Sequence, residues 1–286
     1  MNRNTTKKYV LITGASTGIG EASALEMANN GWYVFAGVRK KEDGEKLQEK
    51  AGRAIIPLIL DVTKKEDIKE AEKRVQEIVE NIGLAGLVNN AGIAIPGPLE
   101  ILPIEDIKQQ IQVNLLGVIV MIQTFLPLIR VSQGRIVVIG SNSGFWCEPF
   151  LSIYGATKFG LEGIVDALRL ELRPWNINVS IIEPGCIRTP IYEKSRESIS
   201  KLQDKTPIEK QNLYAKAINA LLSSVDIAEK IAVSPEKVAK AVRHALESRR
   251  PKTRYRVGID SKIESFLIKF IPDHLRDYII RKLMRL

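Results

Sequence analysis

The sequence contains very little cysteine and histidine. Cys147 and Cys186 are its two cysteines, and His244 and His274 are its two histidines, in a chain of 286 residues. Two cysteines cannot form a disulfide framework, which predicts a reduced intracellular protein. The histidines are far apart and have no cysteine or carboxylate at ligand spacing, so the sequence predicts no metal site.

Acidic residues are scarce at the carboxyl end, and most of the net charge of +9 arises there. Residues 249–286 contain 11 Lys or Arg and 4 Asp or Glu, whereas residues 1–248 contain 31 and 29. A nucleic-acid-binding protein is expected to gather its cations on a reading surface of the folded domain. The nearly neutral body therefore predicts that nucleic acid is not a partner.

Long hydrophobic runs are also missing. The first eight residues are polar, and no apolar segment of a signal peptide follows them. The longest apolar stretch, residues 113–129, is interrupted by three polar residues and Pro127, and falls short of the roughly 18 apolar residues that span a bilayer. The sequence therefore predicts a cytoplasmic protein without a transmembrane helix.

Short apolar runs alternate regularly with longer segments of helical spacing. The runs are rich in Val and Ile, as expected of parallel strands buried on both faces. They cover residues 9–13, 32–38, 54–60, 84–88, 135–140 and 177–182, and residues 255–258 are a candidate last strand. This order predicts an α/β fold, namely a single-domain Rossmann-type doubly wound parallel sheet over residues 1–286, with helices on both faces.

Several helix ends are marked by residues with known positional preferences. Thr63 and Glu66 have the spacing of a capping box, which predicts a helix over residues 66–80. Ser234 is the expected N-cap of a later helix, with Pro235 at its first position. Between the sixth strand and that helix, residues 190–234 are mixed and mostly helical in composition.

The loop after the first strand is rich in glycine and is followed by a helix. Glycines would let the backbone approach a pyrophosphate, while the helix N-terminus offers free N–H groups and the positive end of its dipole. An ordinary tight turn is the alternative, but the position after the first strand favours a dinucleotide site. The residues expected to form it are Gly14, Ser16, Thr17, Gly18, Ile19 and Gly20.

The GxxxGxG spacing of this loop resembles that of the short-chain dehydrogenase/reductase family, and the resemblance covers about residues 7–190. NNAG at residues 89–92 resembles the family motif that supports the sheet and lines the cofactor. PGCIRT at residues 184–189 resembles the motif that holds the nicotinamide carboxamide. The resemblance also implies contacts with the adenine ring after the third strand, where a role for the aspartate in starting a helix is an open alternative. The cofactor-binding residues implied in this way are Asp61, Val62, Asn90, Ala91, Gly92, Pro184, Gly185, Ile187 and Thr189.

The second strand ends in two cations, Arg39 and Lys40. An acidic residue here would bind the ribose 2′-hydroxyl and select NAD, whereas a basic one accommodates the 2′-phosphate of NADP. The guanidinium fork of Arg39 suits a phosphate well. These residues predict NADP(H) as the cofactor, with NAD(H) as the alternative, although Thr17 stands where many NADP-using relatives have a second basic residue.

Tyr154 and Lys158 are four residues apart, so on a helix they share one face. An ammonium near a phenol favours the phenolate, and we expect Lys158 to lower the pKa of Tyr154 from its usual value of about 10. Such a phenol can serve as the general acid for a carbonyl oxygen, or as the base in the reverse direction. In the family both residues also contact the cofactor.

The resemblance implies two further catalytic residues. Ser141, which lies 13 residues before Tyr154, would hold the reacting oxygen, and Ser143 is the competing assignment. Asn114 lies in an apolar helical stretch, where an unbonded amide is costly. In the family this residue holds a water that links Lys158 to solvent, and a buried asparagine satisfied by backbone is the alternative.

The carboxyl-terminal part resembles the branch of the family that contains retinol and hydroxysteroid dehydrogenases. This implies a lipophilic steroid, retinoid or fatty-acyl substrate, with residues 190–234 as the segment that covers it. Residues 259–286 form a basic amphipathic extension, interrupted at Pro272, that could lie on a membrane surface, on the protein or on another subunit. Family members are often homo-oligomers, which we also expect here.

These observations predict an NADP(H)-dependent oxidoreductase of lipid or steroid metabolism. It would interconvert an alcohol and a carbonyl by hydride transfer, with Tyr154 as the general acid or base. An NAD-dependent enzyme of the same family is one alternative. A regulator that binds a dinucleotide without catalysis is another.

Overall fold

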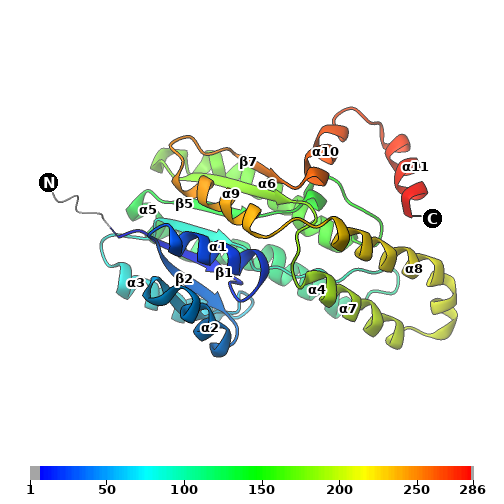
Figure 1. Cartoon of the computed structure of the whole chain (residues 1–286), viewed down its shortest axis with the longest axis horizontal. Coiled ribbons are helices and arrows are strands. Elements are labelled where there is room, and N and C mark those ends of the chain that lie inside the picture. The colour runs from blue at the N-terminus through cyan, green and yellow to red at the C-terminus, as the bar shows by residue number, and fades with distance from the viewer. Residues whose placement is uncertain (1–6, 285–286) are drawn as a thin grey trace.

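The computed structural model describes residues 7–284; the polar start, residues 1–6, and the last two residues lie outside the described part (Figure 1). The strands are β1 (Tyr9–Thr13), β2 (Tyr33–Val38), β3 (Ile55–Ile59), β4 (Gly86–Asn89), β5 (Arg135–Ile139), β6 (Asn178–Pro184) and β7 (Arg254–Val257). The α-helices are α1 (Gly18–Asn29), α2 (Lys41–Ala51), α3 (Lys65–Val79), α4 (Ile104–Ile111), α5 (Gly117–Ser132), α6 (Ser152–Glu171), α7 (Ile191–Lys205), α8 (Ile208–Ile231), α9 (Glu236–Glu247), α10 (Ile259–Leu267) and α11 (Asp273–Met284). The seven predicted strands are confirmed, with their ends displaced by at most two residues.

The strands form one parallel sheet in the order β3-β2-β1-β4-β5-β6-β7. The chain winds outward in one direction from β1 to β3 and then, after crossing back, in the other direction from β4 to β7. Ligands of such sheets bind at the carboxyl ends of the strands where the winding reverses. The point of reversal here lies between β1 and β4, so the loops that follow these two strands are placed to form a binding site.

The two faces of the sheet carry separate hydrophobic cores, because successive strand residues point to opposite sides. Tyr9 and Leu11 of β1 pack with α3, α5 and α6 on one face, whereas Val10 and Ile12 pack with α1, α2 and α9 on the other. Figure 1 shows α1 and α9 side by side over the near face. Helices thus cover both faces, which confirms the predicted doubly wound architecture.

One long helical segment, Ile104–Ser132, runs without a break from α4 to α5. By length and composition it could cross a membrane, so the prediction that the chain has no such segment needs correction. Its most apolar 18 residues have a mean hydropathy of 1.9, because the polar residues among them are too few to lower the average further. In the fold, however, one side of the segment packs on the sheet, where Met121, Phe125 and Ile129 are fully buried.

The start of α3 differs from the prediction. Lys64 is its N-cap and no side chain caps the helix, so the capping box predicted for Thr63 and Glu66 is wrong. Thr63 is bound instead by the carboxylate of Asp61, which accepts its hydroxyl at 2.7 Å and its backbone N–H at 3.0 Å. A carboxylate two residues away competes better for this threonine than the helix end does.

Helices α7 and α8 pack against each other and extend together beyond the sheet, on the right of Figure 1. They have a small core of their own, formed by Ile199, Ile218 and Leu221. Phe150, from the loop before α6, packs against this core. The mostly helical composition predicted for residues 190–234 is therefore confirmed, and this helix pair is tied to the loop that precedes α6.

Candidate active site

The glycine-rich loop between β1 and α1 is tightly folded. Gly14 and Gly18 have positive φ angles of 64° and 61°, a conformation that side chains disfavour. A Cβ atom at Gly20 would overlap the carbonyl oxygen of Gly14. The first turn of α1 therefore lies directly against the loop, with its free N–H groups at the switch point of the sheet. This cradle fits the pyrophosphate of a dinucleotide.

Two other motifs hold this loop in place. The Asn90 side chain donates to the carbonyl oxygens of Thr13 at 2.9 Å and Gly14 at 3.1 Å. The Thr13 hydroxyl accepts the backbone N–H groups of Asn90 and Ala91, each at 3.0 Å. On the opposite side the Thr189 side chain packs against Gly18. The fold thus brings the motifs after β1, β4 and β6 together, as the sequence predicts.

The residues expected to select the cofactor lie at the ends of β2 and β3. Arg39 and Lys40 are both exposed to solvent. Burial raises the pKa of Asp61, but hydrogen bonds from Thr63 and the positive charges of Arg39 and Lys64 outweigh burial and hold that pKa below its usual value. The charge of Arg39 therefore helps to lower the pKa of Asp61, while the Arg39 side chain itself is exposed to solvent.

Tyr154 and Lys158 lie one turn apart in α6, near the carboxyl end of β5. The Lys158 nitrogen lies 5.6 Å from the centre of the Tyr154 ring and donates to the carbonyl oxygen of Ile139 at 2.9 Å. The lysine side chain is buried, and burial lowers its pKa to about 8, although the nearby Glu162 opposes this. The pair shares one helix face, as the spacing predicts.

The protonation of Tyr154 differs from the expectation. Burial is the largest influence and raises its pKa above the usual value, while the adjacent Ser141 hydroxyl opposes the rise. Lys158 does not reverse this direction; its nitrogen lies 5.6 Å from the ring centre and donates to a backbone carbonyl. A partly buried phenol with a raised pKa is protonated at neutral pH and can donate its proton.

Ser141 lies at the carboxyl end of β5, beside the phenol. Its hydroxyl donates to Oδ1 of Asn142 at 3.1 Å and accepts the backbone N–H of Ser143 at 3.1 Å. Both serines are buried. Of the two candidates, Ser141 is the one whose hydroxyl adjoins Tyr154, which supports the assignment made from the sequence.

Asn114 lies in a π-helical turn, η2 (Gln112–Leu116), between α4 and α5. Its side chain donates to the carbonyl of Ile93 at 2.8 Å and accepts the N–H of Ile93 at 2.9 Å. A Cβ atom at Gly92 would contact both the Asn114 amide oxygen and the Lys158 nitrogen. The buried amide is thus satisfied by backbone, the alternative left open above, and also lies near Lys158. Its part in a proton relay stays a prediction.

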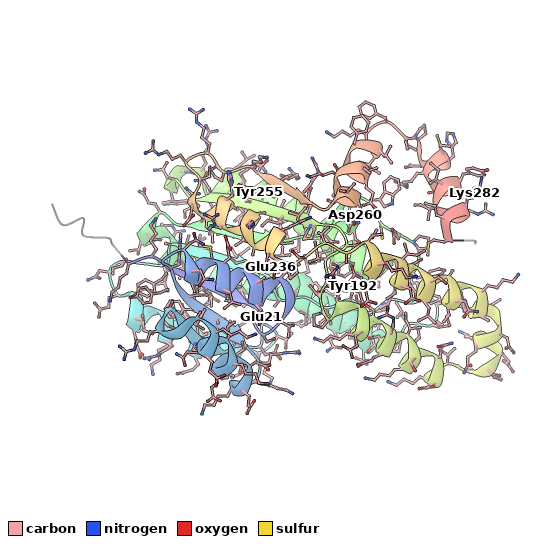
Figure 2. All side chains as sticks on the ribbon, viewed as in Figure 1. Glu21, Tyr192, Glu236, Tyr255, Asp260 and Lys282 are labelled. Atoms are coloured by element: carbon pink, nitrogen blue, oxygen red, sulfur yellow. The ribbon has the colours of Figure 1, made fainter. Side chains whose placement is uncertain are left out.

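The loop after β6 is held by a residue that the sequence analysis missed. Asp260 of α10 accepts the backbone N–H of Cys186 at 2.5 Å. Burial, together with Asp260, raises the pKa of the Cys186 thiol to about 12, so this thiol is not a nucleophile at neutral pH. Figure 2 shows Asp260 on α10 and Tyr192 at the start of α7. No local pattern around Asp260 indicates this role, because its partner lies 74 residues away.

Two surface hollows lie elsewhere. One, of about 420 Å³, is lined by Arg173, Lys252 and other residues at the amino end of β6. The other, of about 600 Å³, lies between β7 and α10. Tyr154 and Lys158 line neither of them. The candidate site is defined here by its side chains and its place at the switch point of the sheet.

The fold and these side chains define a dinucleotide-binding α/β oxidoreductase. The chain matches the family described as short chain dehydrogenase over residues 8–200. It is 34% identical over 280 residues to an NADPH-dependent 3-dehydrocapnine reductase of Ornithobacterium rhinotracheale, covering 96% of each chain. It is 37% identical over 282 residues to retinol dehydrogenase 7 of Mus musculus, covering 94% of this chain and 86% of the relative. A short-chain dehydrogenase from Streptomyces avermitilis has a similar structure, with a TM-score of 0.76, 24% identity and coverage of 99% and 96%.

The chain therefore belongs to the short-chain dehydrogenase family and is an oxidoreductase. The family match ends at residue 200, so α8 to α11 lie beyond the matched segment. The similarity to the two relatives, by contrast, extends over almost the whole chain. The similarity to retinol dehydrogenase 7 supports the assignment of the chain to the branch that contains retinol and hydroxysteroid dehydrogenases.

Proposed function

We propose that the protein interconverts an alcohol and a carbonyl on a lipophilic substrate, with NADP(H) as cofactor. One observation carries the proposal: Ser141, Tyr154 and Lys158 gather beside a loop whose geometry fits a dinucleotide. A bound nicotinamide would supply or accept a hydride at the substrate carbon. The chain itself supplies the proton and the groups that orient the oxygen.

Tyr154 is the proposed proton donor. Its raised pKa keeps the phenol protonated, as a general acid for carbonyl reduction requires. The Ser141 hydroxyl would hold the substrate oxygen within reach of the phenol and stabilise charge that develops there. The nitrogen of Lys158 lies 5.6 Å from the centre of the Tyr154 ring. With a pKa of about 8, this lysine is placed to return a proton to Tyr154 after turnover.

NADP(H) is favoured over NAD(H) by the end of β2. Arg39 and Lys40 leave two exposed cations where a 2′-phosphate would lie. The relative from Ornithobacterium rhinotracheale is named as NADPH-dependent, and an alcohol dehydrogenase of similar fold from Thermococcus sibiricus is a complex with 5-hydroxy-NADP. A similar structure from Brucella melitensis is a complex with NADH, which keeps an NAD-dependent enzyme as the second candidate.

The lipophilic substrate is proposed from the helix pair α7 and α8. Their apolar core contacts Phe150, in the loop between Ser141 and Tyr154, so the pair is placed to cover the substrate end of the site. Similar proteins are named retinol dehydrogenase 7 and 17-beta-hydroxysteroid dehydrogenase type 6. Both names describe apolar alcohols, which supports a steroid, retinoid or fatty-acyl substrate here.

Replacing Tyr154 with phenylalanine tests the proposed function. We expect Tyr154→Phe to lower kcat at least ~100-fold in a carbonyl panel with NADPH, since general acid catalysis contributes about 10²–10⁴-fold. NADPH binding, measured by fluorescence, should persist. Reduction at the parent rate in Tyr154→Phe would refute the role of the phenol. NADPH binding by the parent protein without turnover of any carbonyl would favour the regulator.

We also propose that the protein contacts membranes through its carboxyl-terminal helices. The hollow between β7 and α10 is rich in cations, and it is lined by Ala241, Lys252, Arg254, Tyr255, Arg256, Val257, Lys262, Ser265, Phe266 and Lys269. At its rim Phe266 and Phe270 are 64% and 69% exposed. Cations around exposed aromatic rings are suited to a surface of anionic lipid, where an apolar substrate would dissolve.

We also propose, on the basis of the family, that the protein forms a homo-oligomer. It is supported by exposed apolar side chains on adjoining helices, namely Ile111 of α4, Leu116 of the π-helical turn and Phe159 of α6. Exposed apolar side chains that gather in this way are typical of a protein interface.

A further inference from the structure

A chain of hydrogen bonds links α10 to Ser141. Oε2 of Glu264 accepts from the side-chain nitrogen of Asn142 at 2.8 Å. Oδ1 of the same asparagine accepts the Ser141 hydroxyl at 3.1 Å. Glu264 and Asn142 are 122 residues apart and belong to separate elements, so the tertiary fold alone creates this link.

Glu264 determines which end of the Asn142 amide faces the serine. The structure has Oε2 of Glu264 accepting from the NH2 group of Asn142, and an ionised carboxylate, which can only accept hydrogen bonds, keeps the amide in this orientation. The amide oxygen is thereby turned toward the Ser141 hydroxyl and the backbone N–H of Ser143, which it accepts at 3.1 Å. With the amide reversed, an NH2 group would oppose the Ser143 N–H, and two donors would repel each other.

The orientation of the amide decides how Ser141 is held. In the observed arrangement the serine oxygen accepts one N–H and its hydroxyl donates to Oδ1 of Asn142. Both interactions fix the position of the oxygen beside Tyr154. A bound substrate oxygen would take over the hydroxyl proton, while the N–H of Ser143 would still hold the serine oxygen. With a reversed amide, the repulsion between its NH2 group and the N–H of Ser143 would displace the serine oxygen. Small displacements of a reacting group are costly, since a misplacement of about 1 Å can lower a rate about 100-fold.

Glu264 lies among other acidic groups. Burial raises the pKa of Glu264 to about 7, with Glu148 and Asp260 contributing, while the hydrogen bond from Asn142 opposes the rise. Asp260, on the same helix, holds the backbone of Cys186 after β6. Helix α10 therefore contacts the loops after both β5 and β6, and it belongs to the part of the chain beyond the family match.

We propose that Glu264 is a positioning residue that acts through Asn142 to orient the Ser141 hydroxyl. Helix α10 thus contributes to the site although it lies outside residues 8–200, which match the family model. The inference rests on the proposed function for its catalytic consequence. The hydrogen-bonded orientation of Asn142 does not depend on that function and can be measured separately.

A set of variants in the full chain tests the kinetic consequence. We expect Glu264→Ala to lower kcat about tenfold with KM for NADPH unchanged, because the serine is displaced and the cofactor loop is not. Glu264→Gln keeps an oxygen acceptor and should retain kcat within about threefold. In the Asn142→Ala background, Glu264→Ala should have little further effect, since coupled residues are not additive. Glu70→Ala, an exposed glutamate of α3, is the matched control.

A second measurement does not require turnover. The side-chain amide resonances of Asn142, assigned by their loss in Asn142→Ala, should move in Glu264→Ala and stay close to the parent position in Glu70→Ala. Unmoved amide resonances, a kcat in Glu264→Ala within twofold of the parent, or additive effects of the two substitutions would each overturn the proposal. If the parent turns over no carbonyl, the proposed function fails, and the amide resonances still decide whether Glu264 orients Asn142.

Discussion

At the scale of single residues, burial rather than pairing decides protonation at the candidate site. Lys158 is buried and Tyr154 is partly removed from water, so the pKa of the acid rises and the pKa of the base falls. Each shift favours the neutral form, as expected when desolvation outweighs nearby charge. A neutral phenol beside a lysine that titrates near pH 8 is suited to donating a proton and recovering it.

Arg39 offers a test of cofactor choice at the same scale. A charge-assisted bond to phosphate contributes about 1.5–3 kcal/mol, which corresponds to roughly 10- to 100-fold in affinity. We therefore expect Arg39→Ala to raise KM for NADPH by about this factor and to leave KM for NADH nearly unchanged. Steady-state kinetics with both cofactors measure the effect.

The matched control is Lys41→Ala, which removes an exposed cation that pairs with Glu45 at 3.3 Å. It should leave both constants near the parent values. A ratio of the two KM values that is the same in Arg39→Ala and the parent would rule out a role for Arg39 in binding the phosphate.

At the scale of elements, α10 has two different faces. One face holds the loops of the site through Asp260 and Glu264, and Ser261 binds the carbonyl of Glu183 at 2.8 Å. The other face is exposed and carries Phe266 beside the cationic hollow. The helix is amphipathic, as the sequence predicts, but its polar inner face serves the site and its apolar outer face lies in solvent.

The outer face yields a prediction about lipid binding. The parent should sediment with vesicles of phosphatidylcholine and phosphatidylglycerol more than with phosphatidylcholine alone, because anionic lipid attracts the cations of the hollow. Sedimentation should fall several-fold in the double variant Phe266→Ser/Phe270→Ser and in Lys262→Glu/Lys269→Glu.

Leu213→Ser is the control for this experiment, since Leu213 is 69% exposed on α8 and lies outside the hollow. It should sediment like the parent. Equal sedimentation of the parent and both double variants would exclude the membrane contact.

At the scale of the whole molecule, buried carboxyl groups make stability depend on pH. Burial raises the folded-state pKa of Glu162, flanked by Glu183, and of Glu264 to about 7 each, from a usual value of 4.5. The folded state then binds more protons than the unfolded state between pH 4.5 and 7, so stability falls as pH rises through this range. On lowering the pH from 8 to 6, each group should add about 1 kcal/mol to the free energy of unfolding.

Lys158 opposes this gain. Its folded-state pKa of about 8 lies below the usual 10.5, and protonating it below pH 8 costs stability, here less than about 0.5 kcal/mol. The net prediction is a more stable protein at pH 6 than at pH 8, measured by urea unfolding. The gain should shrink in Glu162→Gln. Equal or lower stability at pH 6 would contradict the raised pKa values.

Much of the site could be predicted because its motifs are local in sequence. The glycine spacing, the residues at strand ends and the interval between Tyr154 and Lys158 each occupy one short segment, and a parallel sheet places the carboxyl ends of its strands at one edge. The threonine of the wrongly predicted capping box shows the limit of such reasoning. Thr63 had two candidate partners within three residues, and the conformation of the loop after β3 decided in favour of Asp61.

The order of apolar and polar residues by itself determined the alternation of strands and helices, and with it the doubly wound sheet. It also determined the helix face that Tyr154 and Lys158 share. These features depend on periodicity within short segments. Tertiary structure alone decided the π-helical turn at Asn114, the raised pKa of Tyr154 and the contact of Glu264 with Asn142. The physical reason is that burial and hydrogen bonding between distant segments depend on which surfaces meet, and no local pattern records that.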